Sequence, residues 1–222
     1  MSKTSNTDTT KDKIKDSKFR ITDRDYKIVQ EIDRWQICTS RHIRYLAGFT
    51  GQRACDRRLR KLIDAGYIER KKILYGFPGI YQNTYKAKAL GHVPKEKKIR
   101  VEHLSHDISV LDTAIYMNKR GIPFTAMTTE RQLHSTDGFS VRKHRPDFAY
   151  TQDRKTTCVE VELTLKARTN FVKNIKDDFT NYDKQIWVVP DLDCKIACIL
   201  QENIKKYPNI EILELSEVKD NR

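Results

Sequence analysis

One stretch of the sequence combines a row of basic residues with a row of apolar ones. The 23 residues from Thr50 to Lys72, TGQRACDRRLRKLIDAGYIERKK, contain eight Lys and Arg. Helical steps of three and four place these apolar side chains on one face: Cys55, Leu59, Leu62 and Ile63. The same steps place Arg53, Arg57, Arg60 and Asp64 on the opposite face. Guanidinium groups in such a row can bind phosphates or pair with base edges, while the apolar face packs on a core.

The net charge of the chain is unevenly distributed. The 222 residues carry a formal charge of +13. Residues 1–100 hold 25 Lys and Arg against 11 Asp and Glu, a net +14, whereas residues 101–222 hold 18 against 19. This division predicts that the N-terminal half meets a polyanion and that the other half has a different task.

The basic stretch follows two other expected helices and precedes two expected strands. TDRDYKIVQEIDRW begins at Thr22, a candidate N-cap, and TSRHIRYLAG gives a second, shorter helix. The basic helix runs from Gln52 to Ala65 and ends at Gly66, and YIERKKILYG and GIYQNTYKA have strand character around a turn. Three helices and a hairpin form the plan of a winged helix-turn-helix.

The phrase RRLRKLIDAGYIERKK resembles the end of a recognition helix in that family, and the resemblance covers about residues 20–92. It implies that the basic face lies in a DNA major groove, with Gln52 able to pair with adenine and the wing residues on phosphates. The implied DNA-binding residues are Gln52, Arg53, Arg57, Arg60, Lys61, Arg70, Lys71 and Lys72. A basic helix that is merely solvated is the alternative.

The second half contains carboxylates at short spacing. In RPDFAYTQDRKTTCVEVELTLK, Asp147 follows Pro146, and Glu160 and Glu162 lie two apart on an expected strand, where they share a face. The segment resembles the PD-(D/E)XK nuclease core, in which such acids bind Mg²⁺ and activate water. The resemblance implies Asp147, Glu160 and Glu162 as metal ligands for Mg²⁺ or Mn²⁺, with no cofactor otherwise required.

The resemblance departs from the family where a Lys is usual, because Glu162 stands there. Lys166 is a candidate substitute, so the catalytic set of an active enzyme would be Asp147, Glu160, Glu162 and Lys166. The missing Lys favours a nuclease-like fold that does not cut DNA, and enzymatic activity stays open. His103 and His106 flank the start of an expected helix, where a surface role is favoured over metal ligation.

The expected elements of this half follow the order α-β-β-β-α-β-α-β, with FTAMTTERQL as the first strand. This order predicts a mixed sheet with helices on both sides. The fold class is therefore α+β or α/β, with an N-terminal winged helix-turn-helix and a mixed α/β nuclease-like domain. The expected division is a disordered tail (1–18), the winged helix (19–92), a linker (93–101), the nuclease-like domain (102–216) and a short tail (217–222).

The whole arrangement is similar to the replication-relaxation family of plasmid and mobile-element proteins. The matching residues are Pro146, Asp147, Glu160 and Glu162, with HDISVLDTAI and TTERQL in the expected order. The resemblance implies a sequence-specific double-stranded DNA-binding protein of a plasmid, phage or conjugative element. It would act in replication, DNA relaxation or mobilisation at an origin-like site, with a relaxase or replication initiator as a possible partner. The alternatives are a metal-dependent endonuclease and a transcriptional repressor whose C-terminal half dimerises or binds a partner.

Two classes of protein are disfavoured by composition. No apolar run approaches 18 residues, so a membrane span is not expected. The five cysteines are odd in number and form no C-x-x-C pair, which argues against a disulfide framework or a zinc site and favours a reducing cytoplasm. A homodimer is possible.

Overall fold

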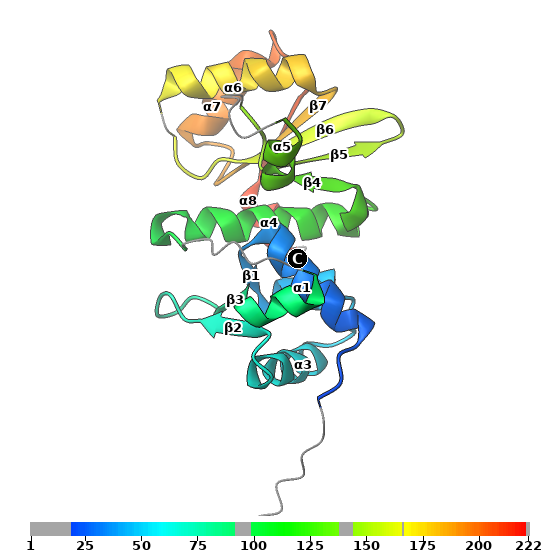
Figure 1. Cartoon of the computed structure of the whole chain (residues 1–222). Coiled ribbons are helices and arrows are strands. Elements are labelled where there is room, and N and C mark those ends of the chain that lie inside the picture. Colours follow the sequence, from blue (N-terminus) through cyan, green and yellow to red (C-terminus); the bar gives the residue numbers. More distant parts are fainter. Residues whose placement is uncertain (1–18, 92–98, 138–143, 166, 221–222) are drawn as a thin grey trace, which may run out of the picture.

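The computed structural model of the chain describes residues 19–91, 99–137, 144–165 and 167–220, and it shows a mixed α and β protein with two separate sheets (Figure 1). The expected tail 1–18 and residues 92–98 of the expected linker lie outside the described residues. We call residues 19–91 the N-terminal unit and residues 99–220 the C-terminal unit. Within the described residues, no helix is both long and apolar enough to cross a membrane.

The N-terminal unit consists of three helices, a small sheet and a 3-10 segment. Its elements are α1 (Asp23–Trp35), β1 (Cys38–Thr39), α2 (Ser40–Leu46), α3 (Gln52–Asp64), β2 (Ile68–Lys71), β3 (Ile80–Asn83) and η1 (Tyr85–Leu90). The sheet order is β1-β3-β2, and both pairings are antiparallel. The predicted cap at Thr22 is confirmed, because Thr22 and Asp25 form a capping box.

The C-terminal unit is a five-stranded sheet covered on both faces. Its helices are η2 (Val101–His103), α4 (Leu104–Lys119), η3 (Phe124–Ala126), α5 (Glu130–Asp137), α6 (Arg168–Asn181), α7 (Lys195–Ile204) and α8 (Leu215–Asp220). Its strands are β4 (Met127–Thr129), β5 (Phe148–Gln152), β6 (Lys155–Val161), β7 (Lys184–Val189) and β8 (Ile210–Glu214). The order is β4-β5-β6-β7-β8, antiparallel up to β6 and parallel from β6 to β8.

Alternation along the strands divides the core of this unit between the two faces of the sheet. Ile186 and Val188 of β7 belong to the apolar cluster that contains α4, whereas Trp187 and Val189 belong to the cluster that contains α6 and α7. The expectation of helices on both sides is therefore confirmed. The parallel pair β6–β7 is joined by α6, as a parallel crossover requires.

Two sequence expectations for this unit were wrong. The expected strand FTAMTTERQL is a strand only over β4, and α5 begins at Glu130. The reason is local: Thr129 Oγ1 accepts a hydrogen bond from Gln132 N at 3.4 Å, and Gln132 Oε1 accepts one from Thr129 N at 3.0 Å, which is a capping box. The expected tail 217–222 begins inside α8, where Val218 is fully buried.

Helix α4 lies between the five-stranded sheet of its own unit and the N-terminal unit (Figure 1). Every residue from Ser109 to Met117 is buried, which a helix with only one covered face cannot achieve. One apolar cluster accordingly runs from Ile28 and Leu59 of the N-terminal unit, through Leu111, to Val188 of the second sheet. The two expected domains thus share a core.

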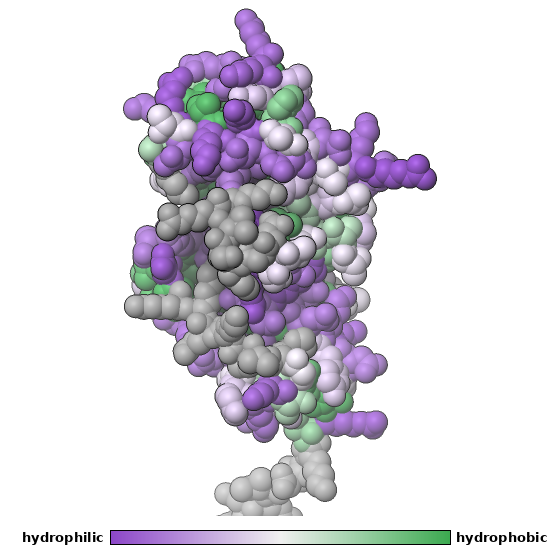
Figure 2. All heavy atoms as spheres, turned by 45° about the horizontal axis from the view of Figure 1, so that its top comes forward, coloured by the Kyte–Doolittle hydropathy of each residue, from purple (hydrophilic) through white to green (hydrophobic). Residues whose placement is uncertain are grey.

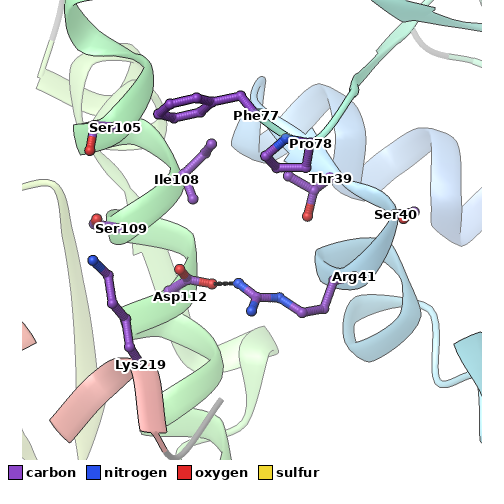
Figure 3. A pocket seen from close by; sticks show the side chains of 10 residues that line it. All are labelled: Thr39, Ser40, Arg41, Phe77, Pro78, Ser105, Ile108, Ser109, Asp112 and Lys219. Carbon is purple, nitrogen blue, oxygen red and sulfur yellow. Dashed lines mark hydrogen bonds and ion pairs between the residues drawn. The ribbon is translucent and has the colours of Figure 1, made fainter. Parts of the chain in front are cut away.

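Polar contacts also connect the two units. Asp112 of α4 is fully buried and forms an ion pair with Arg41 of α2 (Figure 3). Its Oδ1 also lies 3.0 Å from His42 Nε2. Arg34 of α1 donates to the carbonyl oxygen of Phe124 at 2.8 Å. Beside the Arg41–Asp112 pair lies a pocket of about 390 Å³. Residues of both units line it, including Lys219 of α8 (Figure 3).

Among the residues that Figure 2 colours by hydropathy, hydrophilic side chains predominate. The coloured hydrophobic residues form only small, separate areas in this view. Exposed apolar residues of this scattered kind are normal for a folded domain and mark no docking surface by themselves.

Candidate functional site

The outer face of α3 carries a row of basic side chains. Arg53, Arg57, Arg60 and Lys61 are all exposed, and none of them forms an ion pair with another described residue. Helix α3 lies at the end of the molecule away from the second sheet (Figure 1). The row is therefore an accessible cationic surface, which we call the α3 basic face.

The opposite side of α3 holds the helix in place. Cys55, Leu59 and Leu62 are buried, as the periodicity predicts. Arg58, which lies between the two faces, donates from Nε to Asp25 Oδ1 at 2.6 Å, and its Nη2 pairs with the other oxygen of Asp25. Arg58 is thus a structural arginine, and it differs in role from its neighbour Arg57.

The β2–β3 hairpin adds further cations near α3. Arg70 and Lys72 are exposed, whereas Lys71 Nζ forms an ion pair with Glu69 at 2.9 Å. Lys72 lies over the ring of Tyr75, at 5.4 Å from the centroid, and Tyr75 is 96% exposed. Gln52, at the start of α3, donates to Asp56 at 2.8 Å, so its amide is already engaged in the free protein.

A second set of polar residues converges inside the C-terminal unit. His144 precedes β5, Glu160 lies on β6 and Asp178 lies on α6. His144 Nε2 is 2.7 Å from Glu160 Oε1 and 3.5 Å from Asp178 Oδ2. Although these distances are short, none of the three atoms makes a hydrogen bond of acceptable direction. We call these three residues the His144 cluster.

Burial and mutual charge shift the pKa values of the His144 cluster. Burial lowers the pKa of His144, but the neighbouring carboxylates of Asp178 and Glu160 outweigh burial and raise that pKa to about 10. Burial raises the pKa of the Glu160 carboxyl, and the charges of Asp147 and Asp178 add to the effect. Burial likewise raises the pKa of Asp178.

Asp147 lies beside the cluster and turns toward α4. Its Oδ2 accepts a hydrogen bond from Val161 N at 2.8 Å, and its Oδ1 lies 3.3 Å from Nε2 of His106. Burial lowers the pKa of His106, but Asp107 and Asp147 raise it to about 10. His106, for which a surface role was expected, is instead a partner of Asp147.

The expected trio of carboxylates is not the set that converges. Within the described residues, the group of His, Cys, Asp and Glu side chains able to hold an ion together is His144, Glu160 and Asp178, with ligand atoms within 4.8 Å of one another. Of the expected ligands only Glu160 belongs to it. Glu162 follows the end of β6, where its N donates to Val188 O at 3.0 Å, and Lys166 lies outside the described residues.

One signal in the sequence could have identified Asp178. The buried residues of α6 are Phe171, Ile175 and Asp178, which follow one another by four and three positions. A carboxylate at the third position of an apolar helical stripe is unusual, since buried charges need partners. His144 gives no comparable signal, because it precedes a strand in an irregular segment.

Comparison with known proteins adds no relationship to this geometry: no protein-family model matches the chain, and the search of curated proteins gave no match.

Proposed function

We propose that the chain is a sequence-specific double-stranded DNA-binding protein and that its N-terminal unit is a winged helix-turn-helix. The observation that carries the proposal is the α3 basic face, whose cations are exposed and free of ion pairs with described residues. The order of three helices followed by a β-hairpin supports it, since that plan presents its third helix to a major groove.

The dimensions of α3 suit this task. The α3 basic face extends from Arg53 to Lys61, a length of about 12 Å at 1.5 Å per residue. An α-helix with its side chains is about 10–12 Å in diameter, and the major groove of B-DNA, about 12 Å wide, admits it. A cation in such a groove either contacts a phosphate or pairs with guanine, and arginine does the latter bidentately. Arg57, in the middle of the row, is the proposed base-reading residue.

The hairpin has a different proposed role. Arg70, Lys71 and Lys72 would contact phosphates, which position a protein on the duplex without reading sequence. Lys71 must break its ion pair with Glu69 before it can contact a phosphate, so its contact should be weaker than those of Arg70 and Lys72. The exposed ring of Tyr75 beside Lys72 is available for packing against a sugar or base edge.

For the C-terminal unit we propose a nuclease-like scaffold that supports the N-terminal unit. The order α4, β4, β5, β6, α6, β7 agrees with the order expected for the nuclease-like core, apart from the inserted α5. The proposed setting is a plasmid, phage or conjugative element, where the protein acts at an origin-like site. This setting rests on the resemblance to the replication-relaxation family alone. An endonuclease and a repressor stay the alternatives.

The proposal is tested by selecting binding sites from a random duplex library with the full chain. Selection should enrich one sequence motif, and footprinting on the host element should then locate that motif. Protection near an origin supports the proposed setting, whereas protection of the gene's own promoter supports the repressor. Recovery of unenriched sequences would contradict specific binding.

Two variants make the selection more informative. Arg57→Lys keeps the charge but loses bidentate geometry, so the enriched motif should change at one position while total DNA binding persists. Lys173→Ala, which removes an exposed cation of α6, is the matched control and should leave the motif unchanged.

A further inference from the structure

We propose that His144, Glu160 and Asp178 bind one divalent transition-metal ion, of the class of Zn²⁺ or Mn²⁺. This site goes beyond the proposed DNA binding and does not depend on it. It differs from the set of three carboxylates that the sequence suggested, because it replaces Asp147 and Glu162 by an imidazole and by a carboxylate from α6.

The first argument is the position of Asp178. Asp178 occupies a core position of α6 and is only 1% exposed. A carboxylate there has lost its water and needs compensation. Within the described residues, no Lys or Arg forms an ion pair with Asp178 or with Glu160, so cationic compensation from those side chains is absent.

The second argument is the set of unsatisfied atoms. His144 Nε2, Glu160 Oε1 and Asp178 Oδ2 are buried, face one another and lack hydrogen bonds of acceptable direction. Buried polar atoms of this kind are rare in folded proteins and call for an explanation such as an ion. One ion contacted by all three atoms would satisfy them together.

The third argument is charge balance. Two carboxylates and a neutral imidazole carry a charge of −2, which one divalent ion cancels. A proton on the imidazole leaves the cluster at −1, and a second proton on one of the two carboxyl groups, whose pKa values burial raises, is needed to neutralise it. One divalent ion therefore neutralises the cluster in a single binding event, whereas protonation needs two protons.

The ligand types select the class of ion. Imidazole together with carboxylate suits Zn²⁺ and Mn²⁺, whereas Mg²⁺ prefers oxygen ligands and keeps several waters. Ligand atoms of a tetrahedral site with bonds of about 2.1 Å lie about 3.4 Å apart. The 3.5 Å between His144 and Asp178 fits this spacing, and the 2.7 Å between His144 and Glu160 must widen slightly. Three protein ligands leave a position for water.

The test is metal binding by the full chain. The protein is stripped with EDTA, dialysed, and titrated with Zn²⁺, Mn²⁺ and Mg²⁺ by calorimetry, with bound metal counted by mass spectrometry. One equivalent of Zn²⁺ or Mn²⁺ should bind, and Mg²⁺ should bind at least about 100-fold more weakly. Asp178→Asn and His144→Gln should each weaken binding by about 10-fold or more.

Two controls exclude other sites. Asp177→Asn, at the adjacent position of α6, should leave the affinity unchanged. Cys194 and Cys198 lie four apart and are not fully buried, so the titration is repeated in a Cys198→Ser background. Co²⁺ bound at the proposed site should show d–d absorption without the strong charge-transfer band that thiolates give.

The alternative occupant is a proton shared between His144 and the two carboxylates. In that case the stripped protein binds no metal at millimolar concentration, or the bound metal is insensitive to Asp178→Asn and His144→Gln. Either result would overturn the proposed site.

Discussion

The α3 basic face and the His144 cluster are two ways in which one chain places charge on a helix. On α3 the cations project outward, keep their water and form no ion pairs with described residues. On α6 the carboxylate of Asp178 points inward, against Glu160 and His144, where little water reaches it. The first arrangement costs little folding free energy, and the second must be compensated inside the protein.

This difference separates the charged side chains that can bind an external partner from those that stabilise the fold or bind an ion. Exposed cations without described ion pairs are available to an external polyanion, and their removal should leave stability unchanged. Buried charges have fixed partners, so their removal should change stability or ion binding. Arg58 shows the contrast within α3 itself, since it is bound by Asp25 while Arg57 is free of such contacts.

The largest effect should come from a buried charge at the junction of the units. Asp112→Ala leaves the buried ring of His42 and the guanidinium of Arg41 without their common carboxylate. We expect the free energy of unfolding to fall by about 3 kcal/mol or more, as when a buried ion pair loses one partner. Urea unfolding measures it, with the exposed Glu102→Ala as control. A loss no greater than that of the control would contradict the structural role of this carboxylate.

A smaller effect, with a characteristic pH dependence, should follow loss of the Asp25–Arg58 pair. Burial alone would raise the pKa of Asp25, but hydrogen bonds from Arg58 and Thr22 outweigh burial and lower it. A lowered carboxyl pKa stabilises the fold above the unfolded value of about 3.9 and loses this contribution as the pH falls further.

Arg58→Ala should therefore reduce the free energy of unfolding by about 2 kcal/mol at pH 7. The gap between wild type and variant should shrink below about pH 4, because protonated Asp25 no longer needs the guanidinium. Urea unfolding at pH 7 and pH 3 measures the gap. A gap of equal size at both pH values would show that Arg58 acts by packing and not through the carboxylate.

The outward cations should affect binding instead of stability. Arg57→Ala should weaken binding to the selected duplex by about 1–3 kcal/mol, the usual value of a base contact. The thermal midpoint of the variant should stay within about 1 °C of the wild-type value, because the substitution removes an exposed side chain that forms no ion pair with a described residue. Gel shifts with the selected and a scrambled duplex provide the comparison. Equal losses on both duplexes would remove Arg57 from base readout.

The smallest effect should be that of Lys71→Ala. Lys71 already has Glu69 as a partner, so its contact with a phosphate is in part an exchange of one anion for another. We expect a loss of less than about 1 kcal/mol, the same for selected and scrambled duplexes. A larger loss on the selected duplex alone would make the hairpin a reader of sequence.

The sequence predicts the structure best where helix capping, apolar periodicity and burial agree. The three N-terminal helices, the stripe of α3 and the cap at Thr22 follow from spacing and capping alone. The start of α5 differs from the expectation, because alternation in FTAMTTERQL predicts a strand whereas Thr129 and Gln132 cap a helix there. Here the capping residues decided the local structure.

The shared core and the His144 cluster could not be predicted in the same way. Both depend on contacts between segments far apart in the chain, such as Asp112 with His42 and Asp178 with His144. Periodicity shows which face of α6 is buried, but not which side chains from other segments pack against that face. Glu160 is both an expected ligand and a member of the His144 cluster, but its neighbours there come from an irregular segment and from a helix, and spacing along one strand gives no information on either.

The central claim is most directly tested by the salt dependence of DNA binding. The full chain is compared with the variant Arg53→Ala/Arg57→Ala/Arg60→Ala, and with a control in which the exposed Lys155, Lys173 and Lys176 are changed to Ala. Fluorescence anisotropy gives Kd for one duplex from low to high salt. Each lost phosphate contact should reduce the slope of log Kd against log salt concentration by about 0.9.

We expect the α3 variant to bind at least about 100-fold more weakly, and the control to match wild type. The slope should fall by about 2, because Arg53 and Arg60 would contact phosphates while Arg57 reads a base. An α3 variant with wild-type affinity and slope would contradict the account.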